Sequence, residues 1–203
     1  ADGPLNIINA VKAAIDAASA GQGVLVMMND EIYSGRDVTK TNTANVATFK
    51  APNGGPLGFI VGGEVHYYYR SVRPHTLQSE FDVTGVTALP RVDIIYTHIG
   101  EDRVFVDAAL AAGVRGLIYA GSGMGSIHEA VEAALAEAVS RGVVVVRSSR
   151  TGSGIVAAGL ERWQQQGFLY ADNFNPQKAR LLLQLALLRM HERNEVQSVF
   201  LKY

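Results

Sequence analysis

The sequence predicts an α/β protein made of two parts, and three observations support this prediction. The 203 residues are 48% hydrophobic and 18% charged, which is enough apolar material for one large or two small domains. Residues 92–147 alternate between short apolar runs and stretches with helical spacing, an order typical of parallel strands joined by helices. Residues 31–69 instead carry short β-like segments separated by glycine turns.

The first part is expected to begin with a helix followed by a buried strand. Asp2 is a candidate N-cap and Pro4 suits the first helical turn. The expected buried face of this helix consists of apolar residues at helical spacing: Ile8, Val11, Ile15 and Ala18. Residues 24–28 are continuously apolar, which predicts a strand buried on both faces and closed by Asn29 and Asp30.

A linker is predicted at residues 70–90, because this segment lacks sustained periodicity and contains Pro74, Gly85 and Pro90. The expected domains are therefore residues 1–69 and 91–203. In the second domain the pattern predicts strands at 92–96, 116–119 and 143–147, helices at 102–112, 127–140 and 176–190, and a short closing helix at 195–200.

Composition argues against several classes of function. A formal net charge of −1 provides no basic surface for nucleic acid or an anionic membrane. No apolar run approaches the roughly 20 residues that a membrane-spanning helix needs. The chain has no cysteine, and its five histidines lack metal-ligand spacing, which argues against a zinc site.

Lys40 is the first candidate functional residue. It lies in a segment rich in hydroxyl and amide side chains, among them Thr39, Thr41, Asn42 and Thr43, which could orient an ammonium group and relay a proton. The alternative is an ordinary solvated polar loop, and spacing alone does not separate the two hypotheses.

Ligands of parallel sheets bind beyond the carboxyl ends of the strands, and three stretches are expected there. Residues 119–126 form a glycine-rich loop before a helix, but a dinucleotide fingerprint fails because Ser126 occupies the third glycine position. Residues 147–154 are polar and glycine-rich. Glu161 follows in the third stretch, either as a ligand-binding carboxylate or as a solvated charge at a helix end. No Gly-x-Ser-x-Gly nucleophile elbow occurs.

Several segments together resemble the bacterial type II L-asparaginases and glutaminase-asparaginases. The segments that carry the resemblance span the chain in one order: 28–30, 35–43, 48–50, 81–83, 89–90, 120–123, 146–150 and 175–180. The resemblance implies the end of a larger parallel-sheet N-terminal domain, followed by a smaller Rossmann-like α/β C-terminal domain. It also implies hydrolysis of L-asparagine, with L-glutamine as a second candidate substrate, through a threonine acyl-enzyme and without a metal or organic cofactor.

Members of that family carry their catalytic threonines in N-terminal segments, a Thr-Gly-Gly-Thr-Ile-type loop and a Gly-Thr-Asp-Thr segment, which do not occur in these 203 residues. The resemblance therefore covers about the C-terminal three-fifths of such an enzyme. We expect this chain to be a fragment that is inactive alone and that needs the missing N-terminal segment as a partner.

The resemblance also implies roles for three residues. Lys40 corresponds to the catalytic lysine of the family, which assists proton removal from the attacking threonine. Ser126 corresponds to an Asn or Ser that reaches the substrate from a neighbouring subunit, and Glu161 to the glutamate that binds the substrate α-amino group. The alignment is offset by about one residue around Glu161. The family implies a homotetramer built from intimate dimers, in a periplasmic or secreted location.

Two alternative functions remain open at the level of sequence. One is a non-catalytic α/β domain that senses an amino acid through the loop at residues 121–126. The other keeps the fold but acts on a different amide, as in amidotransferase relatives.

Overall fold

The computed structural model describes residues 2–203, so that only residue 1 of the first expected domain lies outside the described residues. The chain divides after Ser79 into two compact units. Helices and both parallel and antiparallel sheets are present, which confirms the predicted α/β class. No helix within residues 2–203 has the length and apolar character needed to cross a bilayer.

The unit formed by residues 2–79 is built around an antiparallel sheet with the strand order β1-β2-β5-β6. Its elements are helix α1 (Gly3–Ile15) and strands β1 (Leu25–Met28), β2 (Glu31–Ser34), β5 (Gly58–Val61) and β6 (Glu64–Tyr67). A separate two-stranded ribbon pairs β3 (Thr39–Lys40) with β4 (Phe49–Lys50). All strand pairs in these residues are antiparallel, so the expected parallel sheet is not formed by this part of the chain.

Strand β1 is half-buried, and the prediction of burial on both faces is wrong. The chain turns back at once through Asn29 and Asp30, whose φ angles of 53° and 60° suit a two-residue hairpin turn. Met28 and Glu31 pair across that turn. Because β1 is an edge strand of this antiparallel sheet, one of its sides has no neighbouring strand within residues 2–203.

Helix α1 packs through amide side chains rather than through its apolar stripe. Asn9 donates a 2.7 Å hydrogen bond to Asp30, and Asn6 accepts one of 3.0 Å from the backbone of Asn29. Asn6 and Asn9 are buried, whereas Ile8, Val11 and Ile15 are 52%, 56% and 80% exposed. The predicted buried face is therefore wrong for residues 2–79, because the hairpin turn at Asn29 binds the opposite, polar face of the helix.

The unit formed by residues 80–203 contains a parallel sheet with the strand order β10-β9-β8-β7, as the alternating pattern predicts. Its elements are β7 (Val92–Tyr96), α2 (Val104–Ala111), β8 (Gly116–Gly121), α3 (Glu129–Ser140), β9 (Val144–Ser149), α4 (Glu161–Gln165), β10 (Leu169–Tyr170), α5 (Pro176–Ala186) and α6 (Arg193–Lys202). Helix α5 ends four residues before the predicted limit of residue 190. Neither α4 nor β10 was expected from the sequence.

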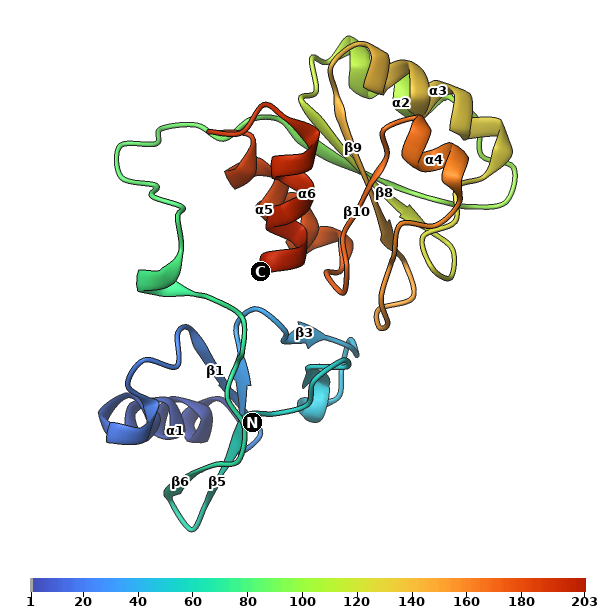
Figure 1. Ribbon diagram of the computed structural model, residues 1–203. Helices are drawn as coiled ribbons and strands as arrows, with labels where there is room; N and C mark the ends of the chain where they lie inside the picture. The colour runs from blue at the N-terminus through green and yellow to red at the C-terminus, as the bar shows by residue number, and fades with distance from the viewer. Residues whose placement is uncertain (1) are drawn as a thin grey trace. The chain divides into compact units, whose positions relative to one another are not determined.

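Two apolar clusters cover the two faces of this sheet. Helices α2 and α3 lie on one side, and α5 and α6 on the other (Figure 1). The first cluster includes Leu117, Leu135 and Trp163, and the second includes Ile118, Leu183 and Phe200. The adjacent residues Leu117 and Ile118 of β8 enter opposite clusters, as expected when both faces of a parallel strand are buried.

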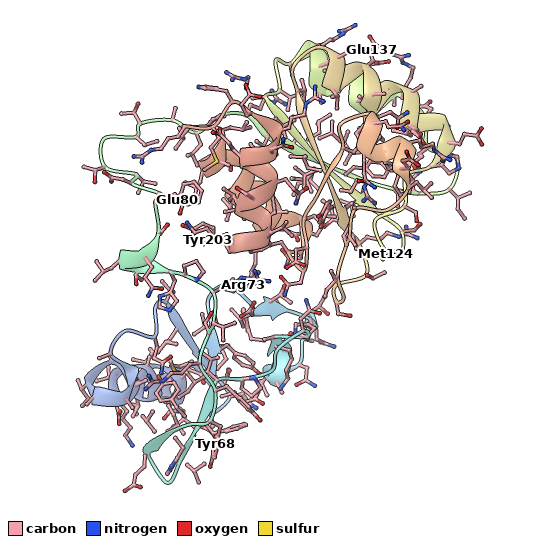
Figure 2. All side chains as sticks on the ribbon, in the orientation of Figure 1. Tyr68, Arg73, Glu80, Met124, Glu137 and Tyr203 are labelled. Carbon is pink, nitrogen blue, oxygen red and sulfur yellow. The ribbon has the colours of Figure 1, made fainter. Side chains whose placement is uncertain are left out.

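The expected linker, residues 70–90, contains no strand and no α-helix. Its second half is attached to the unit of residues 80–203. Arg189 donates to the backbone carbonyls of Glu80 and Asp82, and the ring of Phe81 lies 5.4 Å from that of Tyr203. Glu80 also accepts hydrogen bonds from Lys202 and Tyr203; Figure 2 labels Glu80 and Tyr203.

Candidate active site

The loop that follows β8 presents Ser126 to solvent. The backbone N–H of Ser126 donates a 2.9 Å hydrogen bond to the carbonyl of Ser122, which closes a tight turn whose exposed tip is Met124 (Figure 2). A Cβ at Gly121 would lie 2.4 Å from the carbonyl oxygen of Ser126, so the turn requires glycine there. The Ser126 hydroxyl is thereby held at the carboxyl end of the parallel sheet, where the sequence places a ligand site.

Glu161 is exposed and is the first residue of α4. Its Oε1 accepts a 3.1 Å hydrogen bond from the Gln165 side chain, one turn further along the helix. The carboxylate retains accepting capacity toward solvent and can bind an ammonium group. This position agrees with the hypothesis of a solvated charge at a helix end. It is also compatible with the alternative hypothesis of a ligand-binding carboxylate.

Arg147 connects the segments that carry these two residues. It lies in β9, is 1% exposed, and donates through Nη1 to the carbonyl of Gly125 at 3.3 Å and through Nη2 to that of Ala158 at 2.6 Å. Gly125 immediately precedes Ser126, and Ala158 lies three residues before Glu161. The fold therefore brings the two predicted substrate-binding segments onto one guanidinium group.

A second buried polar group lies at the carboxyl ends of β7 and β8. The carboxylate of Glu101 accepts hydrogen bonds from the hydroxyls of Thr97, at 2.5 Å, and Tyr119, at 2.7 Å. The Tyr119 oxygen in turn accepts from the backbone N–H of His128 at 3.3 Å. Burial, together with the hydrogen bond to Glu101, raises the pKa of Tyr119 to about 12, so the phenol stays protonated and donates to Glu101. This network holds His128, the N-cap residue of α3, two positions after Ser126.

Lys40 belongs to the other unit and lies at the end of β3, opposite Phe49 of β4. Its side chain is exposed, and the described residues offer its ammonium no hydrogen bond or ion pair. Two of the surrounding polar side chains are used within their own loop. Thr41 donates to the carbonyl of Thr48 at 2.8 Å, and the Asn42 side chain accepts from the backbone of Ala44 at 2.9 Å. Within residues 2–203 neither side chain is hydrogen-bonded to the ammonium, and the orientation of Lys40 by its polar neighbours stays a prediction.

In the described part of the chain, neither a metal site nor the cavity along β7 involves the three predicted site residues. Within residues 2–203, no group of three or more His, Asp or Glu side chains is placed to hold a metal ion. A cavity of about 470 Å³ lies along the edge strand β7. Its lining includes Arg91, Tyr96, His98 and Phe105, but none of the three predicted site residues.

The sequence did not indicate a function for Arg147 or for Glu132, whose carboxylate accepts hydrogen bonds from Arg162 and Trp163 of the helix that begins at Glu161. A signal for Arg147 was present, because a charged residue directly follows the four valines of a buried strand. Trp163 is 6% exposed and packs in the first apolar cluster.

Polar loops beyond the carboxyl ends of a parallel sheet define an α/β protein with a ligand site at that sheet edge. The chain belongs to the glutaminase/asparaginase family. Residues 1–73 match the N-terminal asparaginase domain, and residues 91–200 match the glutaminase/asparaginase C-terminal domain.

Individual relatives agree with this assignment. The chain is 45% identical to L-asparaginase 2 of Escherichia coli (strain K12), over 100% of this chain and 59% of that protein. It is 43% identical to the probable periplasmic L-asparaginase of Haemophilus influenzae, over 98% of this chain and 58% of that protein. A crystal structure of a probable cytoplasmic L-asparaginase from Campylobacter jejuni is similar with a TM-score of 0.97 and 41% identity, over 100% of this chain and 66% of that chain.

Proposed function

We propose that this chain is part of an amidohydrolase that converts L-asparagine to L-aspartate and ammonia, with L-glutamine as a second candidate substrate. The observation that carries the proposal is the 45% identity to an L-asparaginase along the whole of this chain. The family description, which includes glutaminases, supports the second substrate. The chain spans only 59% of that relative's length, so the proposal concerns an enzyme of which these residues form a part.

In the proposed reaction, a threonine hydroxyl attacks the side-chain amide carbon of the substrate. Ammonia leaves with the added proton, and water then hydrolyses the acyl-enzyme to release the carboxylate. Lys40 takes part in the relay that removes the hydroxyl proton, because a neutral hydroxyl is a weak nucleophile until a nearby base activates it. Its ammonium has no partner within residues 2–203, which leaves it available to groups outside them.

Ser126 and Glu161 are proposed to bind the substrate rather than to react with it. The Glu161 carboxylate would pair with the substrate α-ammonium, and the Ser126 hydroxyl would donate to or accept from the polar groups beside it. Both side chains are exposed, which supports the proposal that they reach an active centre in a neighbouring subunit of a homotetramer built from intimate dimers.

The nucleophilic threonine is proposed to lie outside these 203 residues, so that the chain alone is inactive. Near Lys40, the hydroxyls of Thr41 and Thr48 are both used in hydrogen bonds to backbone groups of their own loop. Supplying the remaining part of an L-asparaginase should therefore be necessary for activity. The two units also support the proposal of two domains, residues 1–69 and 91–203, joined by the segment 70–90.

A reconstitution experiment tests this function. Ammonia release from L-asparagine and L-glutamine would be measured for the 203-residue chain alone, and again with the part of E. coli L-asparaginase 2 that lies outside its match supplied as a second chain. Hydrolysis is expected only in the mixture, and Lys40→Met should lower its kcat by about 10²- to 10⁴-fold. Lys50→Met, on the paired strand, is the matched control and should leave kcat unchanged.

Three results would contradict the proposal. Efficient asparagine hydrolysis by the chain alone would show that it carries its own nucleophile. Tight binding of L-aspartate by the chain alone in calorimetry, with no hydrolysis in the mixture, would favour an amino-acid-binding domain instead. Hydrolysis of other amides but not of asparagine in the mixture would point to an amidotransferase-like substrate.

The proposed location is the periplasm or the exterior of the cell, which the name of the Haemophilus relative supports and that of the Campylobacter structure opposes. Cell fractionation with an antibody against the chain decides between the compartments.

A further inference from the structure

Arg147 is a buried cation that forms no ion pair with a carboxylate among residues 2–203. Its Nη2 also donates to the carbonyl of Ala157, so that one guanidinium binds backbone carbonyls of both segments beside the site. None of its interactions in residues 2–203 is an ion pair. Burial lowers its pKa to about 10, which still leaves the group charged at neutral pH.

A buried charge is costly unless it is paired or fully hydrogen-bonded. Arg147 is compensated by carbonyl oxygens and by the ring of Trp163, whose centroid lies 4.6 Å from the guanidinium carbon. Its Nε finds no acceptor among the described residues. An apolar side chain would avoid that desolvation cost but would leave the carbonyls of Gly125, Ala157 and Ala158 without this donor, so what the arginine provides here is the connection between the two segments.

The backbone around Arg147 approaches as closely as glycine permits. A Cβ at Gly159, where φ is +74°, would lie 2.8 Å from the Trp163 ring and 2.9 Å from Nη2 of Arg147. A Cβ at Gly125, where φ is +75°, would lie 2.8 Å from the side chain of Val156. A side chain at Gly159 would therefore collide with Arg147 and Trp163, and one at Gly125 would collide with Val156.

Helix α4 is fixed from its other side by Glu132 of α3. The Glu132 carboxylate accepts 3.0 Å hydrogen bonds from Nε1 of Trp163 and from Nε of Arg162. Burial alone would raise the pKa of Glu132, but the hydrogen bonds from Arg162 and Trp163 hold it below its ordinary value, so the group is ionised at neutral pH. The start of α4, and Glu161 with it, is thus held between Arg147 and Glu132.

We propose that Arg147 is a positioning residue that sets the distance between Ser126 and Glu161 by binding the backbone of both segments. The identity of the ligand rests on the proposed function, but the clamping of the two segments does not. In the reconstituted enzyme, loss of the clamp should raise KM for L-asparagine by about tenfold to a hundredfold and change kcat much less, because Ser126 and Glu161 bind substrate without reacting.

Hydrogen exchange of the 203-residue chain tests the clamp without any assay of activity. In Arg147→Met, the amides of residues 123–128 and 156–161 should exchange at least about tenfold faster, while those of β8 and α5 keep their rates. Arg115→Met, an exposed arginine of the same unit, is the matched control and should change neither.

Two further variants keep the proposal testable if Arg147→Met does not fold. Arg147→Lys keeps the charge but loses the forked geometry, so it should loosen both segments to a smaller degree. Gly159→Ala should loosen only residues 156–161, because it displaces that segment from Arg147. Uniform acceleration across residues 80–203 in each folded variant, or no acceleration in either segment, would overturn the clamp.

Kinetic measurements on the reconstituted enzyme distinguish failure of the proposed positioning role of Arg147 from failure of the proposed amide hydrolysis. If the reconstituted protein hydrolyses no amide but the two segments loosen together, the proposed function fails and the clamp stands. If the enzyme is active and Arg147→Lys leaves KM for L-asparagine unchanged, the role of Arg147 in placing Ser126 and Glu161 is wrong.

Discussion

The two units of this chain hold their predicted site residues by different physical means. Residues 80–203 have two apolar clusters, one on each face of a parallel sheet, and a buried arginine that binds the segments beside Ser126 and Glu161. Residues 2–79 contain one small cluster formed by Tyr33, Val38 and Ala51. There, Lys40 is placed by a two-residue strand and by hydrogen bonds of the adjoining loop.

This difference shows how an exposed side chain can be positioned. In residues 80–203 the apolar core fixes the position of β9, and the buried Arg147 of that strand binds the backbone of the two surface segments. In residues 2–79 backbone pairing and short polar side chains do the same for Lys40, with little apolar burial. Changes in the apolar core should therefore lower the stability of residues 80–203 most. Changes in loop hydrogen bonds should mainly affect residues 2–79.

The largest effect is expected from Leu135→Ala in α3. Leu135 is fully buried in the first cluster, so its truncation removes apolar burial and leaves a cavity. The free energy of unfolding of residues 80–203 should fall by about 2–5 kcal/mol. Leu181→Ala in α5 is the control, because Leu181 is 53% exposed, and it should change the same quantity by less than about 0.5 kcal/mol. Chemical denaturation followed by Trp163 fluorescence measures both free energies of unfolding. Equal losses in the two variants would contradict the expectation that the apolar core determines the stability of residues 80–203.

A smaller effect is expected from Thr48→Ala in the other unit. The buried Thr48 hydroxyl accepts a 2.8 Å hydrogen bond from the backbone of Asn42 and donates to the carbonyl of the same residue. Its loss should destabilise the loop after Lys40 by about 1–2 kcal/mol. Hydrogen exchange of residues 41–48 is the measurement, and the exposed Thr43→Ala is the control. Unchanged exchange in Thr48→Ala would mean that hydrogen bonds do not hold this loop.

The smallest effect concerns the acid stability of residues 80–203. The pKa of Glu132 is held below its unfolded value of 4.5, so its contribution to stability is fully present above pH 4.5 and is lost as pH falls through the lower folded pKa. In Glu132→Gln, the free energy of unfolding should therefore fall less between pH 5 and about pH 3. Glu195→Gln, an exposed change in α6, should keep the wild-type slope. Denaturant titrations at several pH values test this, and identical slopes for all three proteins would contradict it.

The parallel part of the fold was predictable from sequence, because long apolar strands such as 116–119 and 143–147 alternate with helical spacing. The structure confirms those strands within two residues of their predicted limits. The apolar stripe of the first helix gave the wrong face, because Asn6 and Asn9 form specific hydrogen bonds that periodicity does not represent. Helix α4 was missed because five residues are too few for a periodic pattern.

The site was predictable only in outline. Sequence context indicated Lys40 and Glu161 as candidates, resemblance to the family assigned roles to them and to Ser126, and those roles remain predictions. The contact of Arg147 with Gly125 and Ala158 joins residues that are 22 and 11 positions away from it in sequence. No local pattern encodes such a contact, because it depends on how β9 is placed beside the two segments.

By itself the sequence determined the α/β class, the parallel order of the second half and the family, because alternating apolar runs and long matching segments are local properties of the chain. Only the tertiary structure decided which face of α1 is buried, that residues 2–79 pair in antiparallel fashion, and that one buried guanidinium holds the segments of Ser126 and Glu161. These features depend on contacts between residues far apart in sequence, whose energies arise only when the chain is folded.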